Sequence, residues 1–347
     1  ERRSLGATIA GELGSLDALD GFVRREGRPD VHFRGVGRVA IVSSDSTIGV
    51  AIAPAVFALC AKARVTVKDR DDALVTAFAA TLAEERPEFG DALETEVWRG
   101  DDAAQQYRLV RADTVVAYGR DETLTRIRAT LDPGVRFVPY GHRTSVGYVS
   151  REALDDPAEA RAVARAAALD ALLYDGDGCL SLHALFVERG GATGARDFAK
   201  LVAAACDDVA VEFPAGYVER DAPLVAYLRD ALFRAAQGEG FVAAGMSGPH
   251  VVVLDPPREE PPPFLRRTLA LYSVDDPAEA ARMLRTHALP LEAVALSGGA
   301  RADIERFALE SGAARVADLG RLQDPPLGGE HGGQGRILPV VRAIYRG

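Results

Sequence analysis

The chain has 347 residues, of which 48% are apolar and 27% are charged. These are the proportions of a folded globular protein, and the length suggests two domains at roughly 150 residues each. There are 51 acidic and 41 basic residues, which gives a formal net charge of -10. This acidic excess argues against a nucleic-acid-binding protein, because such proteins usually carry a basic surface.

Three cysteines, Cys60, Cys179 and Cys206, are scattered along the chain. Their odd number and wide spacing argue against a disulfide framework and against a four-cysteine metal site, and no other metal-binding motif is present. No apolar run reaches the roughly 18 residues that a membrane span needs. The first residues also lack the apolar core of a signal peptide. We therefore expect a cytoplasmic protein with no membrane span and no metal site.

From residue 36 onward, short apolar runs alternate with helical patterns. In the segment 122–131, for example, Leu124, Ile127 and Leu131 fall on one face of a helix. Such an alternation predicts a parallel sheet covered by helices. The predicted strands are 38–42, 64–68, 93–98, 114–118 and 135–139. The predicted helices are 51–63, 72–85 and 122–131.

The same alternation continues in the second half of the chain, where Asp156 and Pro157 are typical of the start of a helix. The predicted helices here are 156–174, 195–206, 221–236, 277–287 and 300–311. The predicted strands are 182–187, 251–254, 268–272, 291–296 and 314–316. We expect an α/β protein with domains at 1–148 and 149–327. The segment 328–347 is expected to return to the first domain or to contact another subunit.

The segment from Tyr174 to Ser181 carries the strongest chemical signal, because two glycines precede Cys179 just before a predicted strand. Glycines allow a tight turn and leave room for a substrate next to the sulfur. A cysteine is also often a small buried apolar residue. We expect this second role for Cys60 and Cys206, which lie in Ala-rich helical patterns, and spacing alone leaves both roles open for Cys179.

The order of the segments resembles the aldehyde dehydrogenase superfamily, and within it the acyl-CoA reductase (LuxC-like) branch. The stretch 178–188 resembles the nucleophile loop and following strand of that family, 112–122 and 137–145 resemble its cofactor-side strands and turns, and 331–343 resembles its closing segment. The resemblance covers about residues 35–345.

The resemblance implies two Rossmann-like parallel-sheet domains, one cofactor-binding and one catalytic, in a homo-oligomer. It implies that Cys179 attacks an acyl-CoA or acyl-carrier thioester and forms a thioacyl intermediate. A nicotinamide cofactor, NADP or NAD, then reduces this intermediate to an aldehyde.

The resemblance also implies cofactor-binding residues. Lys68 ends a predicted strand, where the family places a lysine on the adenosine ribose or its phosphate, and nearby Arg70 favours NADP over NAD. Gly119 and Thr123 lie at a strand end and in the first turn of the next helix, whose amide groups suit a pyrophosphate. Gly141 lies in the next strand-to-loop turn. The alternatives are a solvated strand-end lysine and ordinary strand-to-helix turns.

Two positions depart from the family pattern. Where hydrolytic members carry a glutamate that activates water, the chain reads Tyr140-Gly141-His142, which favours thioester exchange over hydrolysis. His142 is then either a base or a hydrogen-bonding turn residue. Where the family places an oxyanion-binding asparagine, the chain has Asp45, which would repel an oxyanion unless protonated, so Ser44 is a candidate donor. Asp45 alternatively caps the following helix.

Three functions are therefore open. The first is NAD(P)H-dependent reduction of an acyl thioester through Cys179. The second is a Cys-dependent acyltransferase or thioesterase with His142 or His331 as base. The third is a catalytically impaired binding or assembly protein, which the replaced asparagine and glutamate favour.

Overall fold

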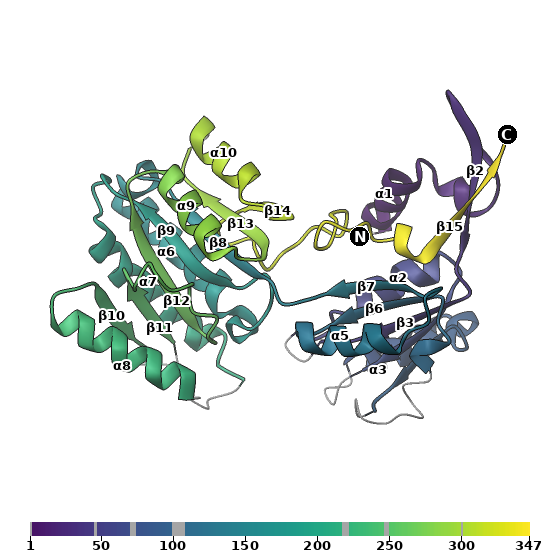
Figure 1. Cartoon of the computed structure of the whole chain (residues 1–347), viewed down its shortest axis with the longest axis horizontal. Coiled ribbons are helices and arrows are strands. Elements are labelled where there is room, and N and C mark those ends of the chain that lie inside the picture. Colours follow the sequence, from purple (N-terminus) through teal and green to yellow (C-terminus); the bar gives the residue numbers. More distant parts are fainter. Residues whose placement is uncertain are drawn as a thin grey trace. The chain divides into compact units, whose positions relative to one another are not determined.

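The computed structural model describes the whole chain except residues 1, 45–46, 70–73, 99–107, 217–221, 246–249 and 300. The chain divides into two compact units (Figure 1). Unit 1 consists of Glu1–His142 and Pro326–Gly347, and unit 2 consists of Arg143–Pro325. The predicted boundary after residue 148 would fall inside strand β8 (Thr144–Val149). The observed division precedes this strand because β8 pairs with strands of unit 2 on both sides.

Unit 1 contains a five-stranded parallel sheet with the order β5-β4-β3-β6-β7. Its strands are β3 (Arg38–Val42), β4 (Arg64–Lys68), β5 (Leu93–Glu96), β6 (Thr114–Tyr118) and β7 (Arg136–Tyr140). The chain runs outward from β3 to β5 and then resumes at β6, on the other side of β3. Ligands of open α/β sheets bind at the carboxyl ends of the strands beside such a reversal.

Helices cover both faces of this sheet. Phe57 of α2 (Ile52–Cys60) and Val75 of α3 (Leu74–Glu85) pack in one apolar cluster with β3 and β4, whereas α5 (Asp121–Thr130) packs in another with β3 and β6. The inner strands are almost wholly apolar because both of their faces are buried.

A smaller antiparallel sheet with the order β1-β2-β15 completes unit 1. It contains β1 (Val23–Arg25), β2 (Arg28–Gly35) and the C-terminal strand β15 (Val341–Arg346), next to α1 (Arg2–Leu13) and the 3-10 helices η1 (Leu16–Leu19) and η5 (Leu338–Val340). A third 3-10 helix of unit 1, η2 (Pro87–Phe89), lies between α3 and β5 in the chain.

Two charged side chains hold the C-terminal segment in unit 1. The carboxylate of Glu12 accepts backbone N–H bonds from Arg336, Ile337 and Leu338 at 2.6, 3.0 and 3.1 Å. The guanidinium of Arg136 donates to the carbonyls of Leu338, Pro339 and Val341 at 2.9, 2.8 and 3.3 Å. Strand β15 therefore starts from a fixed position.

Unit 2 contains a seven-stranded sheet with the order β10-β11-β12-β9-β8-β13-β14, in which only the pairing of β10 with β11 is antiparallel. Besides β8, its strands are β9 (Leu182–Glu188), β10 (Phe241–Ala244), β11 (Val251–Leu254), β12 (Thr268–Val274), β13 (Leu291–Ser297) and β14 (Arg315–Asp318). Its helices are α6 (Pro157–Leu172), α7 (Ala195–Glu212), α8 (Ala222–Ala236), α9 (Pro277–His287) and α10 (Ala302–Glu310), with short turns η3 (Glu152–Leu154) and η4 (Leu173–Gly176).

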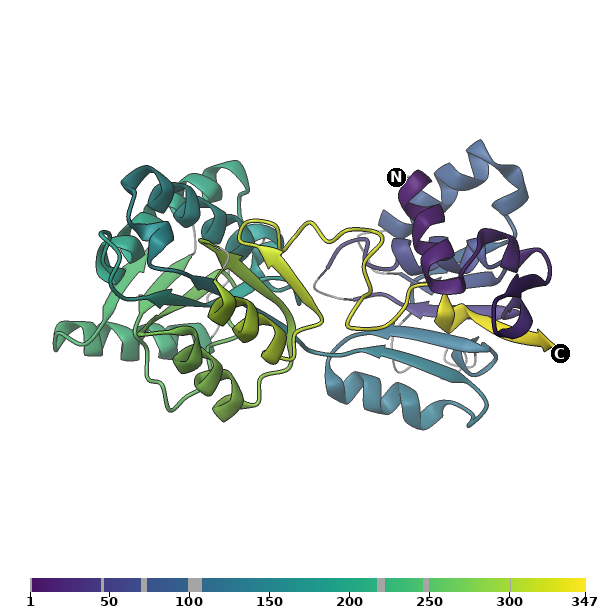
Figure 2. The same ribbon diagram turned by 90° about the horizontal axis from the view of Figure 1, so that it is seen from above.

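The helices of unit 2 form a layer on each face of the sheet, as Figure 2 shows. Helices α6 and α7 pack on one face and α9 and α10 on the other, so alternate residues of one strand enter different cores. In β8, Val149 packs towards α6, whereas Tyr148 packs towards α10.

The predicted α/β class with parallel sheets is confirmed, and so is the start of α6, where Asp156 accepts a hydrogen bond from the Ala158 amide at 2.6 Å. The sequence patterns did not predict α1, β1, β2, β8 and β10. Strands β1 and β2 contain several arginines in a half-exposed sheet, and therefore lack the continuous apolar run of a buried strand.

The close packing of unit 1 can be tested by a substitution at Gly35. A Cβ atom at this position would lie 1.7 Å from the Ala61 carbonyl oxygen. We expect Gly35→Ala to lower the free energy of unfolding by about 3 kcal/mol, because backbone has to move. Gly134→Ala is the control, since its Cβ would meet nothing within 4 Å. Urea unfolding followed by circular dichroism measures both, and equal stability of the two variants would contradict the close approach.

Candidate functional site

Cys179 lies in the loop between η4 and β9, at the amino end of β9, and its side chain is partly exposed. The loop is a tight turn, in which the Ser181 amide donates to the Gly178 carbonyl at 2.9 Å. The Ser145 hydroxyl of β8 donates to the Cys179 carbonyl at 2.9 Å. Backbone and neighbouring strand thus fix the main chain that carries the sulfur.

The chain enters this loop through a strained backbone segment. Tyr174, Asp175 and Gly176 have φ angles of 56°, 57° and 66°, in the left-handed region. Non-glycine residues adopt this region at a cost of about 1–3 kcal/mol each and need support from their surroundings. A side chain at Gly176 would collide with backbone, because its Cβ would lie 2.8 Å from both the Ala171 oxygen and the Arg267 nitrogen.

Arg267 provides this support from the start of β12. Its side chain is only 3% exposed and pairs with the Asp175 carboxylate at 2.7 Å. Its backbone N–H donates to the Asp175 carbonyl at 3.0 Å, and its guanidinium also donates to the Phe213 carbonyl at 2.8 Å. The strained segment is therefore tied to the sheet by a buried charge.

The surroundings of Cys179 keep its sulfur protonated. Burial and, to a smaller extent, the negative charge of Glu292 raise the pKa of the thiol to about 12. The positive charge of Arg143 and the backbone N–H groups of Cys179 and Leu180 act in the opposite direction. Near neutral pH the thiol form predominates, so nucleophilic attack requires a group that removes the proton.

The sequence patterns did not point to Arg143 or Glu292. Glu292 is only 6% exposed and lies 3.8 Å from the Arg143 guanidinium. The sequence feature that could have pointed to Glu292 is a single carboxylate in the otherwise apolar strand of residues 291–296. Its relation to Cys179 depends on strand order, which the sequence does not state.

The predicted cofactor residues lie at the carboxyl edge of the parallel sheet in unit 1. Lys68 ends β4, Gly119 and Gly141 follow β6 and β7, and Ser44, the predicted oxyanion donor, follows β3. The structure thus brings them to one edge of the sheet. The predicted residues Asp45 and Arg70 lie outside the described residues.

This edge presents polar donors. The Lys68 ammonium lies 5.4 Å from the ring centroid of Trp98. Trp98 is 8% exposed, and its indole N–H has no partner in the part of the chain that the structure describes. Thr123 lies in the first turn of α5, the end of a helix that favours an anion, and its own backbone N–H donates to the Arg120 carbonyl at 2.9 Å. These residues fit a phosphate- and ribose-bearing dinucleotide, whose oxygens accept such donors.

The backbone geometry at this edge explains why Gly119 and Gly141 are glycines. A Cβ at Gly141 would lie 2.4 Å from the Asp121 carboxylate, which accepts the His142 backbone N–H at 3.2 Å. Gly119 has a φ of 159°, and its N–H donates to the Tyr140 carbonyl at 3.2 Å. His142 therefore contributes a backbone contact within a turn.

A stack of three rings at the same edge was not anticipated. Tyr118 and Tyr140 are paired in the β6–β7 register, and their ring centroids are 4.8 Å apart. His331 stacks on Tyr140 at 4.3 Å, and its Nδ1 lies 3.3 Å from the Arg336 guanidinium. Tyrosines at the ends of two predicted strands were the signal that pointed to this stack.

The acyl-CoA reductase (LuxC) family model matches residues 1–342. The chain belongs to the acyl-CoA reductase (LuxC) family. It is thus an oxidoreductase that reduces acyl groups of thioesters to aldehydes, and the resemblance inferred from the sequence is confirmed. None of the curated proteins compared with this reductase matches it.

Solved aldehyde dehydrogenases share the fold of the reductase. A putative aldehyde dehydrogenase from Anabaena variabilis is 13% identical with a TM-score of 0.67, over 99% of this chain and 84% of that one. A NAD-dependent benzaldehyde dehydrogenase from Corynebacterium glutamicum is 17% identical with a TM-score of 0.65, over 99% and 78%. An indole-3-acetaldehyde dehydrogenase from P. syringae, in complex with NAD+, is 16% identical with a TM-score of 0.70, over 99% and 75%. At these identities the likeness establishes the aldehyde dehydrogenase fold.

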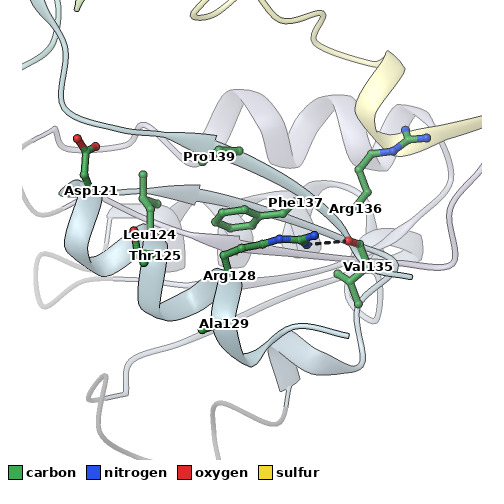
Figure 3. Close-up of a pocket in the computed structure, with 9 residues that line it drawn as sticks. All are labelled: Asp121, Leu124, Thr125, Arg128, Ala129, Val135, Arg136, Phe137 and Pro139. Carbon is green, nitrogen blue, oxygen red and sulfur yellow. Dashed lines mark hydrogen bonds between the residues drawn. The ribbon is translucent and has the colours of Figure 1, made fainter. Parts of the chain in front are cut away.

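The reductase also has a groove of about 900 Å³ in unit 1, between α5 and the edge strand β7 (Figure 3). Leu124, Phe137 and Pro139 form its apolar surface, and the Arg128 guanidinium donates to the Val135 carbonyl at 3.5 Å. No cysteine or histidine lines this groove, so its lining lacks the nucleophile that acyl transfer requires. In the described part of the chain, no helix is long and apolar enough to cross a membrane.

The anchoring of the Cys179 loop can be tested at two neighbouring ion pairs. Asp175→Ala would leave the buried Arg267 charge without its carboxylate, and we expect a loss of about 3 kcal/mol in the free energy of unfolding. The control is Asp177→Ala, which removes the exposed pair with Arg266, also 2.7 Å long. We expect that change to cost below about 1 kcal/mol. Chemical denaturation of both variants checks the difference, and equal losses would contradict the anchoring role of Arg267.

Proposed function

We propose that this reductase forms a thioacyl intermediate on Cys179 and releases an aldehyde after reduction by NADPH or NADH. The observation that supports the proposal is the fixed position of Cys179 in its turn. The Ser145 hydroxyl and the left-handed segment 174–176 hold this turn in place. Family membership supplies the overall reaction. A thiol fixed in this way is suited to attack a carbonyl, because reactions are faster when the reacting atoms are already held in the right orientation.

The residues of the chain divide the work as follows. The Cys179 sulfur attacks the thioester carbonyl, and the Cys179 backbone N–H is a proposed donor to the oxyanion that develops. We retain Ser44 and Asp45 as further proposed oxyanion contacts, and His142 as a turn residue of the cofactor side. A bound reduced nicotinamide supplies the hydride. The absence of a glutamate from residues 140–142 supports release of an aldehyde rather than hydrolysis to the free acid.

The cofactor is proposed to lie at the carboxyl edge of the sheet in unit 1. Lys68 and the Trp98 indole N–H would donate to the adenosine ribose or its phosphate. Gly119, Thr123 and Gly141 would line the pyrophosphate, since the start of α5 favours an anion. We propose NADP over NAD because the sequence places Arg70 beside Lys68.

We further propose a homo-oligomer in the cytoplasm. Strand β15 lies at the edge of its sheet, where Ile344 and Tyr345 are 41% and 61% exposed. Open edges with apolar side chains favour pairing with another chain. All three cysteines are free thiols, as a reducing compartment maintains them.

The function is tested with Cys179→Ala and a panel of acyl-CoAs. We expect loss of acyl-dependent NADPH oxidation and of the acyl adduct in intact mass, with an unchanged circular dichroism spectrum. Cys60→Ala is the control, because Cys60 lies in helix α2 of unit 1 and has no proposed role in the reaction, and it should keep its activity. Full turnover by Cys179→Ala would disprove the assignment. Acylation of Cys179 without any need for a nicotinamide would instead indicate an acyltransferase or thioesterase.

Lys68→Ala tests the cofactor edge. Loss of the ammonium removes one charge-assisted contact, worth about 1.5–3 kcal/mol, so the Kd of NADPH should rise by about 10- to 100-fold. Isothermal titration with NADPH and NADH measures the change and the preference. The control is Lys62→Ala, since Lys62 pairs with Asp20 at the surface. Unchanged NADPH binding by Lys68→Ala would place the cofactor elsewhere.

A further inference from the structure

Three adjacent strands of unit 2 bring two charged residues to the edge of the sheet where Cys179 lies. In the order β9-β8-β13, Cys179 precedes β9, Arg143 precedes β8, and Glu292 stands at the start of β13. All three strands are parallel, so these positions lie at the same amino edge. Ser145, at the same level of β8, donates to the Cys179 carbonyl at 2.9 Å.

Glu292 sits at an irregularity of its strand. Leu291 pairs with Thr144 and Ala293 pairs with Ser145, so Glu292 is the extra residue in the β13–β8 ladder. The register also shifts on the other side of β8, between the pairs Ser145–Leu182 and Val146–Ala184. Such bulges re-aim side chains and are frequent next to active sites. Both irregularities flank the level of Ser145.

Burying a carboxylate at this position costs free energy, which suggests that it has a functional role. Glu292 is 6% exposed in a strand whose other residues are apolar or small. Its ion pair with the Arg143 guanidinium is 3.8 Å long, so no short hydrogen bond joins these two groups. Arg315 of β14 also interacts electrostatically with Glu292, and its N–H groups donate to the carbonyls of Leu322, Arg321 and Asp324.

We propose that Glu292 accepts the proton of Cys179 during acyl transfer and returns it to the departing thiol, and this inference rests on the proposed function of Cys179. In the step, the S–H bond of Cys179 breaks and an O–H bond forms on Glu292. The sulfur then bonds to the acyl carbon, and the bond between that carbon and the coenzyme A sulfur breaks. The coenzyme A thiolate takes the proton from Glu292 and leaves as a thiol.

The charges around the Cys179 sulfur make the role of Glu292 as a proton acceptor distinguishable from a purely electrostatic role. Glu292 opposes ionisation of Cys179 and Arg143 favours it. Replacing the carboxylate by an amide therefore lowers the pKa of the thiol but removes the proton acceptor. A group that acts only through its charge would make the enzyme faster when neutralised, whereas a proton acceptor makes it slower.

Glu292→Gln tests the proposal with two readouts. Alkylation of Cys179 by iodoacetamide, located by peptide mass, should become about tenfold faster at fixed pH for each unit by which the pKa falls. Release of coenzyme A in the first turnover, without any nicotinamide, should become at least about 100-fold slower. The rate of coenzyme A release by the wild-type protein should fall at acid pH as Glu292 is protonated. This acid-side fall in the rate should be absent in Glu292→Gln. Glu292→Asp should recover part of the rate.

Three controls separate the possible outcomes. Glu310→Gln removes one exposed carboxylate of unit 2 and should change neither readout. Arg143→Gln should slow alkylation, because it removes the charge that favours the thiolate. Cys179→Ala gives the blank for both assays, and release of coenzyme A by this variant would contradict the proposed function itself. Faster alkylation together with equal or faster coenzyme A release in Glu292→Gln would overturn the role of proton acceptor.

Discussion

The pairing of β8 with β9 on one side and β13 on the other is the constraint on which unit 2 depends. These three strands are far apart in sequence, and only their shared register brings their amino ends to one edge. This register sets the positions of the Cys179 loop, the Ser145 hydroxyl and the Arg143–Glu292 pair. The helix layers on both faces bury the strands and leave the ends of the sheet as the place for polar groups.

Around Cys179, rigidity and protonation have separate origins. Rigidity comes from left-handed residues that are stable only because Arg267, buried at the start of β12, holds Asp175. Protonation comes from burial and from the charge of Glu292. A thiol that stays protonated until an acyl group arrives reacts less with oxidants and metals, since those reactions need the thiolate. The same arrangement makes the reaction depend on an internal proton acceptor.

The sequence was most informative where local chemistry alone decides the structure. Buried strands such as β4 and β11, and the Asp-Pro start of α6, follow from apolar runs and from capping. The Cys179 loop was also identifiable, because its glycines and the following strand form a local pattern. Glu292 was not, because its importance arises from a bulge and from strand order, which depend on residues that are distant in sequence. The ring stack of Tyr118, Tyr140 and His331 likewise combines three separate segments. Non-local pairing set the limit of prediction for these side chains, whereas weak local signals set it for strands β1 and β2.

Unit 1 is discontinuous: its first part ends at His142, and its last part starts at Pro326. During synthesis from the N-terminus, unit 2 is complete before the ribosome has made β15 or the residues that Glu12 and Arg136 bind. Domains generally fold as units during synthesis. Unit 2 can thus reach its native state while unit 1 still lacks an edge strand. Closing unit 1 last means joining segments separated by almost the whole chain, a step with a large loop-closure entropy. The proposed nucleophile can therefore take its place before the completion of the unit that is proposed to hold the reductant.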